Sequence, residues 1–142
     1  MDPIRVEWKQ RMAFTGHSSE GHEVGMDASA ASGGDGQAPR PTELVLMGLG
    51  GCTGMDVVSI LAKMQQPLRS LEIAVEADRA DEHPKVFTAI RLLYRVAGEG
   101  LELEKVRRAI DLSLDKYCTV GNVLNKTAAI TYEIELNGER MA

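Results

Sequence analysis

Alternation of apolar and polar residues predicts short strands at the start of the chain. Ile4, Val6 and Trp8 fall on one face of the first run, and charged residues fall on the other. Two shorter runs follow, separated by turns that contain glycine and serine. These patterns predict a three-stranded meander over residues 3–26.

The next segment, residues 27–39, is rich in alanine, serine and glycine and has little to bury. This composition predicts a mobile loop. Two interpretations stay open for it: a solvated connection, or a lid over a site. Its length, unusual in a compact domain, gives modest support to the lid.

A long apolar helix is predicted next. Pro41 and Glu43 suit its first turn, residues 44–64 are apolar nearly all round, and Pro67 ends it. A helix without a polar face is expected to be buried on all sides. Each glycine inside it costs about 0.5–1 kcal/mol relative to alanine, so we expect the close approach of another backbone to offset that cost. The glycines are Gly48, Gly50, Gly51 and Gly54.

The rest of the chain mixes strand and helix patterns. Strands are predicted at 71–78, 86–97 and 130–136, an amphipathic helix at 102–117, and a short helical turn at 120–127. The order βββ–α–ββ–α–β indicates an α+β fold with mostly antiparallel strands. The face of the amphipathic helix expected to be buried carries Leu103, Val106, Ile110, Leu114 and Tyr117.

Composition limits the possible partners and compartment. The chain has 142 residues, a formal net charge of −5 and 4% aromatic residues, so we expect one domain and no nucleic-acid partner, which would need a basic face or stacking platforms. The N-terminus lacks a signal-peptide pattern. The apolar helix carries Asp56 and Lys63, which argues against a membrane span. We therefore expect a cytoplasmic protein with no membrane partner.

Two cysteines, Cys52 and Cys118, are the candidates for chemistry. They are too few for a disulfide scaffold, and the histidines show no metal-ligand spacing with them, so we expect no metal. Taken alone, two inert buried thiols are their simplest interpretation. The glycine cluster at 48–54 fits neither a dinucleotide-binding loop nor a P-loop, since no strand precedes it and no Gly-Lys-Ser/Thr ends it. The cluster does leave space for a small molecule, or another chain, to come close to Cys52.

Two segments of the chain resemble the OsmC/Ohr family (osmotically induced protein C and organic hydroperoxide resistance protein). The likeness covers nearly the whole chain and is nearest to the YhfA-like branch of that family. The segments are Pro41-Thr42-Glu43-Leu44 leading into Met47-Gly48-Leu49-Gly50-Gly51-Cys52 with Asp56-Val57-Val58 after it, and Lys116-Tyr117-Cys118-Thr119-Val120.

The resemblance implies an architecture. It implies a single OsmC-like domain over residues 1–142, with an N-terminal sheet and mobile loop in 1–40. The central helix, the second sheet and the C-terminal helix then lie in 41–142. It also implies an intertwined homodimer, with buried central helices and two active sites at the interface.

The resemblance further implies an activity, the thiol-dependent reduction of organic hydroperoxides in oxidative-stress defence. Cys52 would be the peroxidatic cysteine and Cys118 the resolving one. The nucleophile in such chemistry is a thiolate, which needs a lowered pKa near neutral pH. Electrons would come from an external dithiol, for example of the lipoyl type, and no bound cofactor is implied.

The residues expected to activate the thiol depart from the family pattern. In the peroxidase branches, an arginine of the N-terminal sheet pairs with a glutamate at the start of the central helix. Thr42 stands at the usual glutamate position here, and Glu43 lies about 100° further around the helix. Glu43 either serves in that role or only favours the helix N-terminus. Arg11 is our candidate arginine, with Arg40 as its substitute, and an ordinary surface charge is the alternative for each.

This departure keeps a second function open. The same dimer would then be a non-enzymatic redox sensor, or would bind a small apolar ligand.

Overall fold

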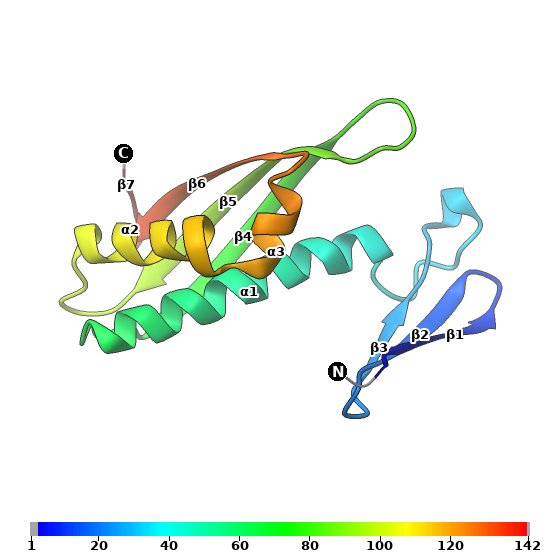
Figure 1. Cartoon of the computed structure of the whole chain (residues 1–142), viewed down its shortest axis with the longest axis horizontal. Coiled ribbons are helices and arrows are strands. Elements are labelled where there is room, and N and C mark those ends of the chain that lie inside the picture. The colour runs from blue at the N-terminus through cyan, green and yellow to red at the C-terminus, as the bar shows by residue number, and fades with distance from the viewer. Residues whose placement is uncertain (1–2, 142) are drawn as a thin grey trace. The chain divides into compact units, whose positions relative to one another are not determined.

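The computed structural model describes residues 3–141 and divides the chain into two compact units, residues 1–46 and 47–142. The boundary between the units falls within the long helix (Figure 1). In chain order the elements are β1 (Arg5–Gln10), β2 (Ala13–His17), β3 (Glu23–Met26), η1 (Ala30–Ser32), α1 (Pro41–Lys63), β4 (Ser70–Arg79), β5 (Phe87–Ala97), α2 (Leu103–Leu112), η2 (Ser113–Tyr117), α3 (Thr119–Leu124), β6 (Ala129–Leu136) and β7 (Glu139–Met141).

The first unit contains the predicted meander. Strands β1, β2 and β3 form an antiparallel sheet in that order, with Trp8 opposite Phe14. The turn between β1 and β2 places Arg11 at φ +51°. The apolar side chains of this sheet stay exposed in the single chain; Trp8, for example, is 64% exposed. A sheet of this size needs a covering surface to be stable, so we expect another surface to pack on it.

The segment after β3 has internal structure that its composition did not predict. It contains the short helix η1, and the buried carboxylate of Asp27 accepts the backbone N–H groups of Ala28, Asp35 and Gln37. These bonds hold the pKa of Asp27 below its usual value. One carboxylate therefore organises most of this glycine-rich loop.

The second unit is built on a four-stranded sheet, in the order β4-β5-β6-β7. Strand β5 pairs antiparallel with β4 and parallel with β6, and β6 pairs antiparallel with β7. The mostly antiparallel prediction is thus confirmed, with one parallel pair. The sequence pattern did not predict β7. It follows a tight turn in which Asn137 and Gly138 both have positive φ, as hairpin turns of two residues require.

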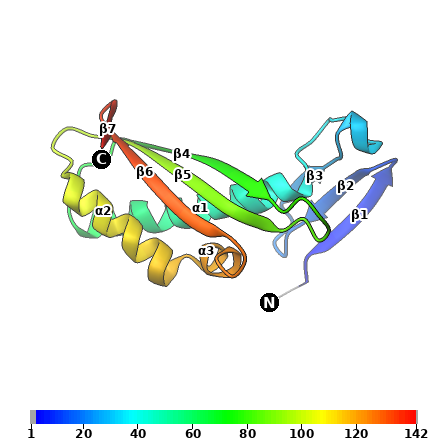
Figure 2. The ribbon, with the colours of Figure 1, turned by 90° about the horizontal axis from the view of Figure 1, so that it is seen from above.

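The two faces of this sheet differ sharply. Alternate residues of β5, from Ile90 to Val96, are buried beneath the helices, and Figure 2 shows α1 and α2 on the same side of the sheet. The opposite face carries ion pairs, such as Arg91 with Asp78 at 3.0 Å. A hollow of about 320 Å³ lies over this face, lined by Glu76, Arg91, Arg95, Glu133 and Arg140 among others.

The helix α1 is not buried on all sides in the single chain, contrary to the prediction. Its buried residues form one stripe, while Met47, Met55 and Val58 on other faces are exposed, Met55 by 75%. By length and composition α1 could cross a membrane, with a mean hydropathy of 1.8 over 18 residues. The core helix of a soluble protein passes the same test.

Some glycines of α1 lie on its buried face and others on its exposed face. A Cβ on Gly54 would lie 3.2 Å from Ile73 Cδ1, so this glycine allows α1 to pack closely on β4. The close contact is with a side chain rather than with the backbone we expected. Gly48 and Gly51 face open space within the single chain.

Candidate functional site

The two cysteines come together in the second unit. Cys52 lies in the middle of α1 and is half-buried, whereas Cys118 is fully buried between η2 and α3. The Cys52 side chain is close enough to hydrogen bond with the Cys118 thiol. The structure therefore brings near each other two free thiols that are far apart in the sequence.

Local structure explains how the Cys118 sulfur is held. Cys118 is the N-cap residue of α3, and its Sγ accepts the backbone N–H of Gly121 at 3.2 Å. A Cβ on Gly121 would lie 3.2 Å from that sulfur and 3.6 Å from Leu49 Cδ1. Glycine at this position therefore leaves room for the thiol between α3 and α1.

A turn of π-helix precedes Cys118 and replaces the last turn of the predicted amphipathic helix. The N–H of Cys118 donates to the carbonyl of Ser113, five residues back, at 2.6 Å. The Asn122 side chain donates to the carbonyls of Leu114 and Cys118 at 3.3 and 2.8 Å. The extra residue in the turn shifts the helical phase, because a π-turn holds more residues than an α-turn. This explains why Tyr117, expected to be buried, is exposed.

A chain of buried polar side chains lies beside the thiols. The hydroxyls of Tyr94 and Thr53 are 2.8 Å apart, and Thr53 Oγ1 lies 2.8 Å from Ser113 Oγ. Ser113 in turn donates to Asp56 Oδ2 at 2.8 Å. Tyr94, Thr53 and Ser113 are fully buried, and Asp56 is half-buried. This chain links α1, β5 and η2 around the cysteine pair.

The surroundings of Cys118 favour its protonated form. Burial raises its pKa to about 11, and the neighbouring Cys52 thiol and the negative charge of Asp56 act in the same direction. The N–H of Gly121 acts in the opposite direction but is outweighed. Near neutral pH, Cys118 is therefore a thiol that can donate its proton to a neighbour.

The expected activating residues, Arg11, Glu43 and Arg40, belong to the first unit, where Arg11 has other partners and Glu43 pairs with Arg40, the substitute arginine. The Arg11 side chain donates to Asp35 Oδ2 at 3.1 Å and to the Gly33 carbonyl at 3.0 Å, so it fastens the loop to the β1–β2 turn. Glu43 accepts the backbone N–H of Arg40 at 3.1 Å and lies 3.6 Å from its guanidinium. This is the helix-capping contact that was one of the two interpretations of Glu43.

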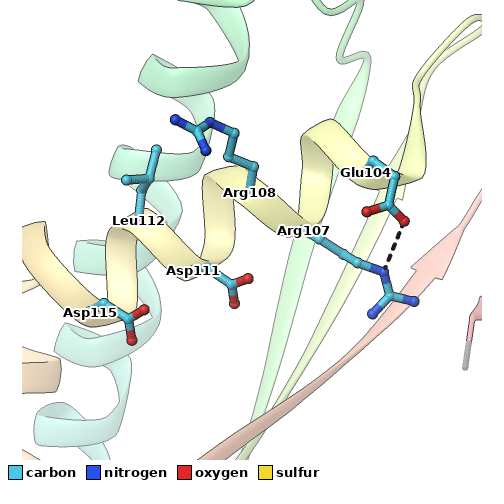
Figure 3. Close-up of a pocket in the computed structure, with 6 residues that line it drawn as sticks. All are labelled: Glu104, Arg107, Arg108, Asp111, Leu112 and Asp115. Atoms are coloured by element: carbon cyan, nitrogen blue, oxygen red, sulfur yellow. Dashed lines mark ion pairs between the residues drawn. The ribbon is translucent and has the colours of Figure 1, made fainter.

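A second hollow, of about 300 Å³, lies along the exposed side of α2 (Figure 3). Its walls carry three carboxylates and two guanidinium groups, with Glu104 and Arg107 paired at 3.8 Å. It contains no cysteine, and we assign it no part in the thiol chemistry. Its lining residues are Glu104, Arg107, Arg108, Asp111, Leu112 and Asp115.

Sequence reasoning missed the polar residues around the thiols. Asp56 was noted only as a charge within an apolar helix. An acid one turn after a cysteine, in a helix otherwise without charges nearby, was the available signal. Ser113, Asn122 and Tyr94 gave no signal, because their contacts depend on the tertiary fold.

Comparison with known proteins identifies the class of this fold and site. The family model of OsmC-like proteins matches residues 34–133. The chain therefore belongs to the OsmC-like family, as the two cysteine segments indicated.

Individual relatives agree with this assignment. Protein YhfA of Escherichia coli strain K12 is 42% identical over 132 residues, covering 93% of this chain and 96% of that protein. A structure from structural genomics, 39% identical, has a TM-score of 0.84 and covers 94% of this chain and 97% of its own. The organic hydroperoxide resistance protein OhrB of Bacillus subtilis shares the fold at 17% identity, with a TM-score of 0.64 and coverage of 94% and 97%.

Proposed function

We infer that the protein has a redox or peroxide-related role, because the chain belongs to the OsmC-like family. We propose that the protein is a thiol peroxidase that reduces organic hydroperoxides, with Cys52 as the peroxidatic and Cys118 as the resolving cysteine. The observation that carries the proposal is the contact between a half-buried and a fully buried thiol.

The proposed cycle has three steps. The Cys52 thiolate attacks the O–O bond of the hydroperoxide and becomes a sulfenic acid, and the alkoxide leaves as an alcohol after taking a proton. Cys118 then bonds to the Cys52 sulfur, and the hydroxide leaves with the Cys118 proton as water. An external dithiol, for example of the lipoyl type, reduces the Cys52–Cys118 disulfide and is itself oxidised to a disulfide.

The surroundings of the two thiols support this division of roles. A peroxidatic cysteine must be reached by substrate, and Cys52 is the more accessible of the two. Cys118 keeps its proton near neutral pH, because burial raises its pKa to about 11. The Cys118 thiol therefore carries the proton that leaves with the hydroxide of the Cys52 sulfenic acid in the second step.

The proposed working form is a homodimer. Each unit exposes apolar side chains, those of β1 in the first unit and those of α1 in the second, and a second copy of the chain is the partner we propose to cover them. Gly48 and Gly51 would let a partner helix approach closely, because neither has an atom within 4 Å of a built Cβ. We propose further that the protein acts in the cytoplasm, with no bound cofactor or metal and with no nucleic-acid or membrane partner.

A steady-state assay with cumene hydroperoxide and dihydrolipoamide tests the activity. We expect the wild type to consume hydroperoxide over many turnovers. The Cys52→Ser variant should be inactive, and the Cys118→Ser variant should stop after about one equivalent, because no internal thiol resolves its sulfenic acid. Absence of turnover by the wild type with several organic hydroperoxides would overturn the proposal.

One observation favours the second function, a redox sensor or a binder of a small apolar ligand. Thr42 stands at the usual glutamate position, and Glu43 makes a capping contact with Arg40. A sensor would react once with hydroperoxide and form the disulfide without turnover. A binder would take up an apolar ligand equally well in the Cys52→Ser variant.

A further inference from the structure

Four hydrogen-bonded side chains beside the thiols take no part in the cycle proposed above. Thr53 and Asp56 follow Cys52 on α1 by one and four residues, which places Asp56 one helical turn from Cys52. Both bind the hydroxyl of Ser113, the first residue of η2. The segment that carries Cys52 is thus tied directly to the turn that carries Cys118.

The hydrogen bonds among Tyr94, Thr53, Ser113 and Asp56 can be donated in only one direction. The single hydroxyl hydrogen of Ser113 goes to the Asp56 carboxylate, so Ser113 must accept from Thr53. Thr53 then has no hydrogen left and must accept from Tyr94. Because all three hydroxyls are fully buried, removing one member leaves an unpaired polar group. The acceptor oxygen of Asp56 therefore fixes the direction of all the hydrogen bonds in this network.

The main chain of Ser113 is hydrogen-bonded to Cys118, so the bonds that hold the Ser113 side chain also restrain Cys118. Its carbonyl accepts the Cys118 N–H at 2.6 Å, so a single residue joins the side chains of α1 to the backbone of the buried cysteine. Asn122 holds Cys118 from the other side by donating its side-chain N–H to the Cys118 carbonyl. A movement of Ser113 would therefore displace the Cys118 sulfur.

We propose that Thr53 and Asp56 are positioning residues that clamp Ser113 and so hold the Cys118 sulfur against Cys52, which sets how readily the two thiols close to a disulfide. That the clamp assists the reaction of Cys118 with the Cys52 sulfenic acid rests on the proposed function. Disulfide bonds tolerate only a narrow range of geometry, and held reactants gain a high effective concentration. In resolution, the S–S bond forms as the S–O bond of Cys52 breaks, and Cys118 is oxidised while Cys52 is reduced.

Equilibration with reduced and oxidised glutathione tests the clamp without hydroperoxide, because it measures how readily Cys52 and Cys118 form a disulfide. Oxidised glutathione takes the electrons of the two thiols and becomes two reduced molecules, and the ratio at half-oxidation gives the effective concentration of one thiol at the other. We expect Asp56→Ala, Ser113→Ala and Thr53→Val to lower it about tenfold, as loss of a buried hydrogen bond implies. Asp56→Asn and Thr53→Ser should stay near the wild type, because they keep the acceptor and the hydroxyl.

Tyr132→Phe is the matched control. It removes the more exposed hydrogen bond from the Tyr132 hydroxyl to Asp111 at 2.7 Å, keeps the ring that packs edge-on against Tyr94, and should leave the effective concentration unchanged. Urea unfolding of the reduced proteins separates loss of stability from loss of positioning. If Ser113→Ala fails to fold, the comparison of Thr53→Val with Thr53→Ser decides the question.

Three results would overturn the clamp: an unchanged effective concentration in Asp56→Ala and Thr53→Val, an equal loss in Asp56→Asn and Asp56→Ala, or a wild type that forms no internal disulfide. A wild type that closes the disulfide through this clamp but does not turn over hydroperoxide would support the clamp and refute the peroxidase function.

Discussion

The sulfur of Cys118 accepts the backbone N–H of Gly121 across 3.2 Å, so the same atom caps α3 and faces Cys52. Oxidation of Cys118 changes the acceptor at the start of α3. The state of the thiol pair is therefore coupled to the first turn of that helix.

Replacement of Gly121 by alanine tests this coupling. The added Cβ would lie 3.2 Å from the Cys118 sulfur, closer than most contacts of such an atom, so the sulfur must shift. We expect Gly121→Ala to slow closure of the Cys52–Cys118 disulfide about tenfold, because thiol exchange depends on alignment. Quenched-flow oxidation with thiol trapping measures the rate.

Val123→Ala is the control for this prediction. Val123 lies on the same helix with its side chain 64% exposed, so its truncation should leave the rate unchanged. Equal slowing in both variants would mean that general loosening of α3, and not the contact with Cys118, controls the rate.

The raised pKa of Cys118 predicts a loss of stability in alkali. Burial raises it to about 11, so the folded protein keeps a proton that the unfolded chain loses near its ordinary value of 9.0. The unfolded state then binds fewer protons, and the free energy of unfolding falls as pH rises from about 9 to 11. Urea unfolding across this range should show a steeper decline in the wild type than in Cys118→Ser.

The buried tyrosines do not account for a difference between the wild type and Cys118→Ser. Burial raises the pKa of Tyr132 to about 12 and also raises that of Tyr94, and both tyrosines are present in both proteins. Parallel curves for the wild type and Cys118→Ser would contradict the shift.

Loss of the Tyr94 hydroxyl should weaken the fold. Tyr94→Phe leaves Thr53 without its buried donor, and we expect the free energy of unfolding to fall by about 1 kcal/mol. Tyr132→Phe loses a more exposed bond and should cost less. Chemical denaturation at neutral pH measures both, and a larger loss in Tyr132→Phe would show that the buried chain contributes little.

A charge on the exposed face of α1 should break the proposed dimer. Met55 is 75% exposed and apolar, so an aspartate there is tolerated in a single chain but not at an apolar interface. We expect Met55→Asp to sediment as a monomer in analytical ultracentrifugation. Thr131→Asp, on the exposed side of the second sheet, should sediment like the wild type, and a monomeric wild type would contradict the dimer.

Much of the fold was predictable because local patterns determine it. Alternation located the strands from β1 to β6, and Pro41 and Pro67 bracketed α1. The failures lie where tertiary contacts override local preference. The π-turn at Ser113–Tyr117 looks like ordinary amphipathic helix in sequence, and the bonds of Ser113 to Thr53 and Asp56 form only in the tertiary fold.

The site was predictable only in part, for a related reason. Cysteines are few and their motifs distinctive, so Cys52 and Cys118 stood out. Common residues such as Ser113 and Asn122 act through hydrogen bonds with residues that the fold brings near, and no spacing in the sequence marks those partners. Asp27 is a similar case, because its three backbone partners sit in a loop whose composition indicates only flexibility.

The parallel pairing of β5 with β6 has a consequence for the newly made chain. Parallel neighbours need a long crossover, and here the crossover is the stretch that carries α2, η2 and Cys118. On a ribosome, Cys52 emerges well before the crossover can close, and it has no internal thiol to meet until the last long strand has docked. Oxidation of a half-made chain would therefore join Cys52 to a foreign thiol, because the segment that carries Cys118 is made later.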